Sequence, residues 1–102
     1  MADVIDSAFQ TQSSDASAVS DTLQLLAGRV DQVIASYTSL RDSIAQIGEE
    51  HEALAPVTGS LVAKLDASIT TQKEIRDKLN ATATSLTSSV SEWKMIKKSM
   101  VI

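Results

Sequence analysis

The sequence predicts an all-α protein, an antiparallel two-helix hairpin of coiled-coil type with an N-terminal helical or extended arm. Aliphatic side chains recur every three to four residues from Val19 to Leu54, as they do in a helix with one narrow apolar seam. The only proline, Pro56, then interrupts the pattern, and a second, weaker seam follows it. A short break between two helices joins antiparallel neighbours. A seam of this kind has to be covered, so we expect the hairpin to pack into a larger helical bundle or filament.

Residues 1–14 form the N-terminal arm, predicted to be a short amphipathic helix or an extension. Ile5 and Phe9 continue the heptad spacing backward from Val19. The polar run at 11–14 is a poor helix interior and offers N-cap candidates, so either the first helix starts near residue 3, or a short amphipathic piece precedes the main helix with a break near Ser13. Under the predicted pairing, this arm overhangs the hairpin and exposes its apolar side chains.

The hairpin occupies residues 15–102, and its first helix is predicted at about 15–55. Tyr37 is expected to fill the seam with its ring, since the hydroxyl can reach a helix edge. Gly48 lies beside the seam, where the missing side chain would permit close helix approach. The predicted core seam of this helix consists of Val19, Leu23, Leu26, Val30, Val33, Tyr37, Leu40, Ile44, Ile47 and Leu54, with His51 in the same register.

The turn is predicted at 55–60. Pro56 disfavours helical geometry at Ala55 and removes a backbone donor, and Gly59 permits a positive φ. With the turn at 55–60, Leu40 of the first helix is expected to pair with Ile75 of the second, and Arg41 to lie near Glu74.

The second helix is predicted at about 60–98. Gln72 is a polar residue within its seam, and residues 81–91 are rich in serine and threonine. Those residues have modest helix propensity, but their small size lets a neighbouring helix come close. The core seam of this helix includes Leu65, Ile75, Leu79 and Leu86.

Charge is distributed unevenly along the 102 residues. Residues 1–59 hold nine acidic and two basic side chains, whereas residues 60–102 hold four acidic and seven basic ones. The two halves therefore attract each other when they pack side by side. No dense basic stripe is present, so we expect no nucleic-acid partner, and contact with membranes is not expected either.

Nothing in the sequence predicts catalysis. His51 is flanked by three glutamates, but a metal ligand on a helix needs a partner four residues away, and Ile47 and Ala55 cannot serve. There is no cysteine and no nucleophile–base pair or phosphate-binding glycine loop. We expect a non-enzymatic protein without cofactor or metal.

Localisation is weakly constrained. No apolar run approaches the roughly 20 residues of a transmembrane helix. Asp3 and Asp6 replace the early positive charge of a signal peptide. The expectation is a cytoplasmic protein or one exported by a leaderless route.

The expected function is structural, namely self-association into a homo-oligomer or filament. One alternative is a secreted filament, secretion-system or virion subunit, and another is a small adaptor that binds a partner helix. Trp93 would either cap the seam or join a basic amphipathic docking end. The residues expected at the protein-interaction surface are Val4, Ile5, Phe9, Trp93, Ile96 and Met100.

The predicted hairpin is similar in outline to the WXG proteins of type VII secretion and to type III needle subunits. In the former family the Trp-x-Gly motif lies in the turn, whereas the only tryptophan here is Trp93. Their Tyr-x-x-x-Asp signal is not matched either, because Arg41 stands four residues after Tyr37. With needle subunits the chain shares only Pro56 and the hairpin itself, so it is assigned to neither family.

Overall fold

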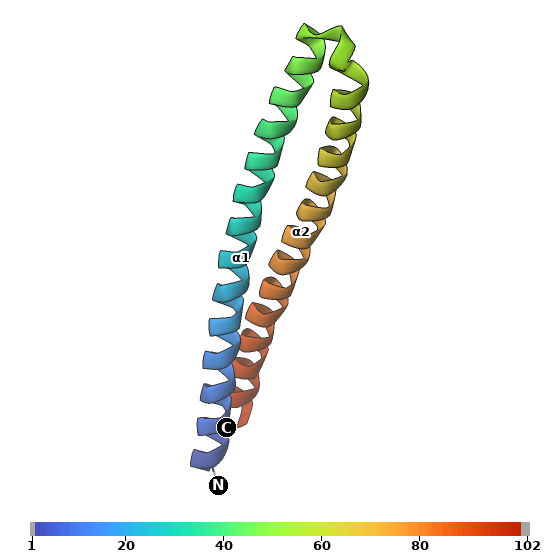
Figure 1. The fold of residues 1–102 in the computed structure, drawn as a ribbon. Helices are drawn as coiled ribbons and strands as arrows, with labels where there is room; N and C mark the ends of the chain where they lie inside the picture. The colour runs from blue at the N-terminus through green and yellow to red at the C-terminus, as the bar shows by residue number, and fades with distance from the viewer. Residues whose placement is uncertain (1, 101–102) are drawn as a thin grey trace. The chain divides into compact units, whose positions relative to one another are not determined.

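The chain is an all-α helical hairpin, which confirms the predicted fold class (Figure 1). The computed structural model describes residues 2–100, and side chains from residue 4 to residue 99. Its elements are α1 (Ala2–Glu50), the 3-10 helix η1 (Glu52–Leu54) and α2 (Ala55–Met100). The helices pair in two units: the turn unit is Ala27–Asp77, and the terminal unit is Met1–Leu26 with Lys78–Ile102.

Helix α1 ends earlier than the sequence predicts, and it begins before residue 15. It is continuous from Ala2 to Glu50, which agrees with a first helix that starts near residue 3 and not with a separate segment broken off near Ser13. Serine and threonine are accommodated because their hydroxyls bond within the helix. Thr11 Oγ1 donates to the carbonyl of Ser7 at 3.0 Å, and Thr22 Oγ1 donates to that of Ala18 at 3.0 Å.

The turn lies at residues 51–54, so its predicted position at 55–60 is wrong. His51 leaves helical geometry at φ −132° and ψ 89°, and the amide of Leu54 donates to its carbonyl at 2.9 Å. Pro56 is the second residue of α2, a first-turn position where its missing N–H has no helical partner to lose. The proline therefore starts α2 rather than ending α1, and Gly59 lies inside this helix without a positive φ.

The contact between the helices of the turn unit follows a strict heptad spacing. Buried and half-buried side chains recur at alternating intervals of three and four residues on both helices. This contact row comprises Ala27, Val30, Ile34, Tyr37, Arg41, Ile44 and Gly48 on α1, and Thr58, Val62, Leu65, Ile69, Gln72 and Arg76 on α2.

The terminal unit has a contact row of the same spacing, built from smaller side chains on α1. Ser20 is 4% exposed, and its hydroxyl donates to the carbonyl of Ala83 at 3.1 Å. A side chain as short as serine reaches the opposite backbone only where the two helices approach closely. The row comprises Phe9, Ser13, Ala16, Ser20 and Leu23 on α1, and Leu79, Ala83, Leu86, Val90, Trp93 and Lys97 on α2.

Half of the predicted core seam lies outside these contact rows. Leu40, for example, is 50% exposed while its neighbour Arg41 faces α2. Leu23, Val30, Tyr37, Ile44, Leu65, Leu79 and Leu86 are half-buried in the rows. The residues that the structure exposes instead are Val19, Leu26, Val33, Leu40, Ile47, Leu54 and Ile75.

Small side chains explain this displacement of the seam. Each exposed residue of the predicted α1 seam, from Val19 to Ile47, immediately precedes a contact residue. Several of those contact residues are small, such as Ser20, Ala27 and Gly48. A Cβ added at Gly48 would clash with Oγ1 of Thr58 and lie 3.2 Å from its Cβ. Close approach of two backbones requires small residues at the contact, which displaces the larger aliphatics to its edge.

The earlier turn also changes which residues face each other. Arg41 bonds to Asp66 of α2 rather than lying near Glu74, about two helical turns from the expected partner. In the terminal unit, Lys97 forms an ion pair with Asp6. The predicted overhang of the N-terminal arm is therefore wrong, because that segment of α1 has its partner in the end of α2.

Candidate interaction surface

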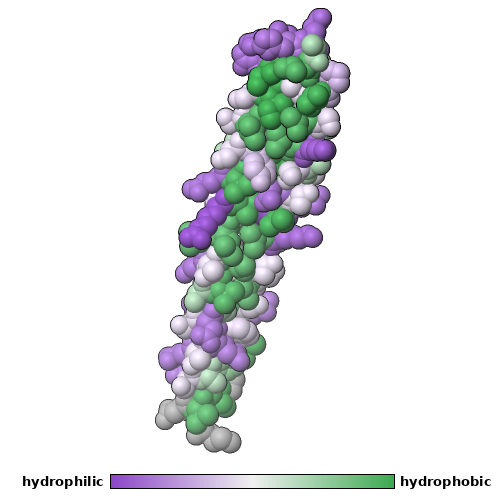
Figure 2. All heavy atoms as spheres, viewed as in Figure 1, coloured by the Kyte–Doolittle hydropathy of each residue, from purple (hydrophilic) through white to green (hydrophobic). Residues whose placement is uncertain are grey.

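Five exposed aliphatic side chains line one side of the turn unit, and we call them the apolar flank: Val33, Leu40 and Ile47 on α1, and Leu61 and Ile75 on α2. Each of them immediately precedes a contact residue of its own helix. In an antiparallel pair of heptad helices, the positions before such contacts on both helices face the same side. Figure 2 shows hydrophobic side chains gathered over α1 and α2 near the turn.

The opposite side of the turn unit is charged and internally paired. Nε of Arg41 donates to Oδ1 of Asp66 at 2.7 Å, and Nη1 of Arg76 donates to Oδ1 of Asp31 at 2.9 Å. Both aspartates immediately follow a contact residue, Val30 or Leu65, and so they face away from the apolar flank. The turn unit therefore presents two chemically different sides.

Each arginine also bonds to the aspartate that follows it in the chain. Arg41 donates to Asp42 at 3.2 Å, and Arg76 donates to Asp77 at 3.1 Å. The hydrogen bonds to the cross-helix aspartates, and then those to the adjacent ones, raise the pKa of both guanidinium groups above their ordinary value. Both arginines are thus charged throughout the neutral range.

The predicted interaction residues lie in the terminal unit. Val4 is 71% exposed and Ile96 is 49% exposed, whereas Phe9 and Trp93 are half-buried. Ile5 is 38% exposed, and the side chain of Met100 lies outside the described residues. Together, the exposed residues leave an apolar surface at this end.

Phe9 and Trp93 also line one small hollow of the terminal unit. Its other residues are Gln10 and Ser13 on α1, and Lys94 and Lys97 on α2. The sequence predicts Phe9 and Trp93 only as members of the same interaction surface, and the structure places them at the same hollow.

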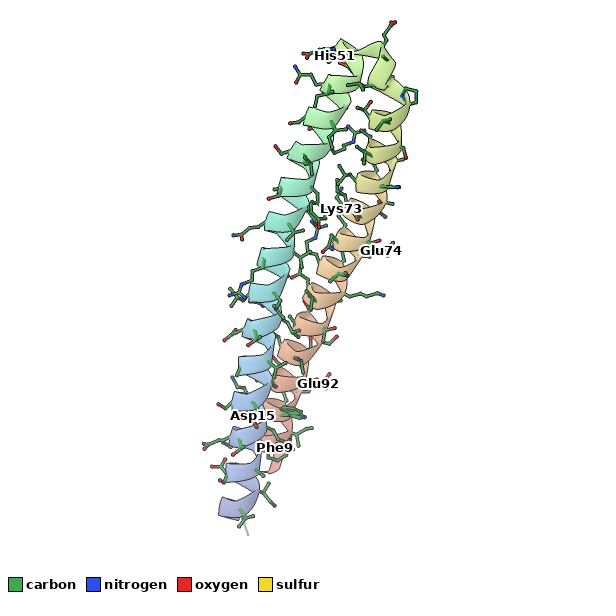
Figure 3. All side chains as sticks on the ribbon, in the orientation of Figure 1. Phe9, Asp15, His51, Lys73, Glu74 and Glu92 are labelled. Atoms are coloured by element: carbon green, nitrogen blue, oxygen red, sulfur yellow. The ribbon has the colours of Figure 1, made fainter. Side chains whose placement is uncertain are left out.

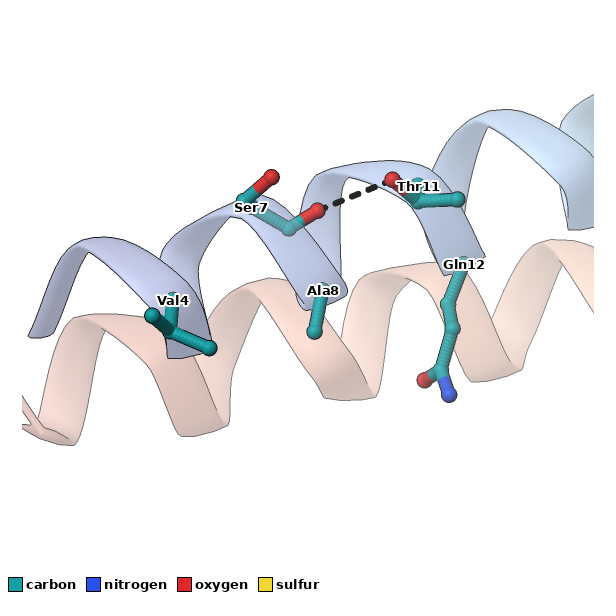
Figure 4. Close-up of a pocket in the computed structure, with 5 residues that line it drawn as sticks. All are labelled: Val4, Ser7, Ala8, Thr11 and Gln12. Carbon is teal, nitrogen blue, oxygen red and sulfur yellow. Dashed lines mark hydrogen bonds between the residues drawn. The ribbon is translucent and has the colours of Figure 1, made fainter. Parts of the chain in front are cut away.

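A second hollow near the N-terminus has only α1 for a wall (Figure 4). Val4, Ala8 and Gln12 lie along one face of the helix beside Ser7 and Thr11, which are joined by a 3.0 Å hydrogen bond. A single helix face cannot enclose a small ligand, so this hollow belongs to the exposed surface.

His51 stands at the turn, fully outside the contact rows (Figure 3). Its amide donates to the carbonyl of Ile47 at 3.0 Å, and its side chain is exposed. Among the described residues, no three acidic, histidine or cysteine side chains come together as metal ligands. No helix in the same part of the chain is long and apolar enough to cross a membrane.

The two arginine pairs are the feature that the sequence pattern did not reveal. Arg41-Asp42 and Arg76-Asp77 are the same dipeptide on two helices, and Asp31 and Asp66 precede them by the same interval. Matching these charges would have given the correct register, whereas matching the large aliphatics did not. Polar signals are informative here because the contact row itself includes both arginines.

The geometry defines the class of protein as an all-α helical hairpin with an apolar surface on one side of the turn unit. Comparisons with models of known families, with curated proteins and with solved structures find no match to this chain.

Proposed function

We propose that this protein is a non-enzymatic structural subunit, which self-associates into a homo-oligomer or filament through the side chains of its helices. The observation that supports the proposal is the small size of the residues buried within one chain. The hydrophobic residues buried in the hairpin are Ala16, Ala27, Ile34, Ile69 and Ala83, and no large side chain in the described part of the chain is fully buried.

Burial of this extent stabilises a hairpin only weakly. Removing one large aliphatic side chain from water contributes about 1.5–3 kcal/mol, and about half of that contribution is missing where Leu40 or Ile47 stays about half exposed. Association would cover these side chains and complete the burial. Small helical scaffolds commonly gain stability in this way.

The test is the molar mass of the full chain in solution over a wide concentration range. Light scattering after size exclusion should give a mass of at least two chains, and negative-stain microscopy would distinguish a closed oligomer from a filament. A folded monomer at millimolar concentration would refute self-association.

A monomer would also favour the alternative role of an adaptor that binds another protein's helix. The observation that supports this alternative is the set of apolar side chains in the terminal unit, where Val4 and Ile96 are exposed and Trp93 is half-buried. An amphipathic helix from a partner could cover such a surface. The alternative of an extracellular filament or virion component would instead require long polymers.

A further inference from the structure

The turn unit contains an internal repeat, whose two copies lie five heptads apart in the chain. Segment 28–42 of α1 and segment 63–77 of α2 both carry an aspartate, then an isoleucine, and then an Arg-Asp dipeptide at matching positions. The matched pairs are Asp31 and Asp66, Ile34 and Ile69, Arg41 and Arg76, and Asp42 and Asp77.

The hydrogen bonds obey the same repeat. Asp31 bonds to Arg76, and its counterpart Asp66 bonds to Arg41, the counterpart of Arg76. When two residues are bonded and their two counterparts are also bonded to each other, the pairing is isologous, the arrangement found about a two-fold axis. The turn unit is therefore an approximately two-fold pair formed within one chain.

Two residues of the apolar flank are related by this repeat. Leu40 is the counterpart of Ile75, and the two are 50% and 41% exposed on the same side of the unit. The position matching Val33 is Ser68, which is also exposed, so these four positions carry three aliphatic side chains and one serine, and none of them is charged. A surface of this kind is chemically matched to itself, as the interface between two identical copies requires.

The chain as a whole also exposes enough area for contact with a second copy. The chain exposes 7275 Å², whereas a compact monomer of 10.9 kDa exposes about 5600 Å² by the usual scaling. The excess of about 1700 Å² is roughly twice the area that each partner contributes to a standard protein interface.

We propose that the apolar flank of the turn unit is the contact surface between two copies of this chain, which pair face to face about a two-fold axis as a four-helix bundle. This inference rests on the proposed self-association and specifies its surface and its occupant. The charged side of each turn unit, with its two arginine pairs, then faces outward.

The test compares full-length variants by sedimentation equilibrium, with circular dichroism as a measure of helicity. Leu40→Glu and Ile75→Glu should each raise the dissociation constant of the dimer at least tenfold, because either places a charge in the contact. Leu25→Glu is the matched control, since Leu25 is 58% exposed on α1 but is separated by one residue from a contact position. The Leu25→Glu variant should leave the dissociation constant of the dimer unchanged.

A second measurement applies even where the glutamate variants lose helicity. The chain has no cysteine, so Leu40→Cys introduces a single thiol. Under mild oxidation, this variant should form a covalent dimer at least tenfold faster than Leu25→Cys. An oligomeric wild type with equal oxidation rates and unaffected glutamate variants would overturn the flank as the interface and leave self-association intact. A wild-type chain that stays monomeric would overturn both.

Discussion

At the scale of single residues, one close contact between the helices of the turn unit is made by a glycine. Gly48 of α1 faces Thr58 of α2, whose hydroxyl donates to the carbonyls of Leu54 and Ala55 at 3.1 and 3.2 Å. Thr58 is buried and β-branched, so it cannot move aside at low cost. The backbone of Gly48 is helical, so glycine is not needed here for an unusual φ. It is needed because a larger side chain would not fit.

Replacing Gly48 by alanine should therefore destabilise the protein. The added methyl gains up to about 1 kcal/mol of helix propensity, but overpacking a tight contact costs about 1–3 kcal/mol. We expect a net loss of about 1 kcal/mol in the free energy of unfolding, measured by urea denaturation.

Gly28→Ala is the matched control on the same helix. A Cβ at Gly28 meets nothing within 4 Å, so only the propensity gain remains, and the variant should be more stable by about 0.5–1 kcal/mol. Effects of the same sign for both substitutions would contradict the close approach at Gly48.

The small residue Ala83 should be equally sensitive to size. It is 1% exposed, and its carbonyl accepts the hydroxyl hydrogen of Ser20 from the facing helix. Ala83→Leu forces about three additional heavy atoms into this contact and should cost about 1–3 kcal/mol in the free energy of unfolding, measured by thermal unfolding. The neighbouring Thr84→Leu, at an exposed site, should change stability by less than about 0.5 kcal/mol. Equal losses would mean that residue 83 is not at the contact.

At the scale of the elements, the sequence predicts both helices and the hairpin because heptad spacing and a single interruption are strong signals. It misplaces every second residue of the α1 seam by one position, since hydrophobicity favours Leu40 over Arg41 and Val19 over Ser20. What decides the contact is how closely the backbones approach, a tertiary property that hydropathy does not encode. The sequence also misplaces the turn, because Pro56 can start a helix as well as end one.

The arginine pairs should be coupled across the helices in a salt-dependent way. In a double-mutant cycle for unfolding, Arg41→Gln and Asp66→Asn should be non-additive at low salt, with the coupling reduced at 1 M salt, where the Debye length is about 3 Å. Asp31 bonds to Arg76 instead, so the cycle of Arg41→Gln with Asp31→Asn should be additive. Coupling of equal size in both cycles would argue against the observed register.

The arginines should not make this coupling depend on pH in the neutral range. Their pKa is raised in the folded state, so their contribution is fully present below the unfolded pKa and is lost only as pH rises through the folded one. That window lies in strong alkali. The cycle measured at pH 7 and at pH 9 should therefore give the same coupling, and a marked loss at pH 9 would contradict charged arginines as its source.

At the scale of the whole molecule, the two candidate surfaces lie in different units. The apolar flank belongs to the turn unit, whereas Val4, Ile5 and Ile96 belong to the terminal unit. Deleting residues 2–12 therefore separates their roles. It removes Asp6 and Phe9, which lie with Lys97 and Trp93 in the terminal unit, and it leaves Ala27–Asp77 untouched.

The deletion should loosen the terminal unit and preserve the dimer. Trp93 is the only tryptophan, so its fluorescence should shift to longer wavelength as its cover is lost. Amide hydrogen exchange should accelerate in residues 90–97 but not in the turn unit, because locally stabilised segments open independently. Light scattering should give the same number of chains per oligomer for the deletion variant as for the full-length protein. A monomeric deletion variant would instead assign the interface to the terminal unit, since the flank of the turn unit is intact in it.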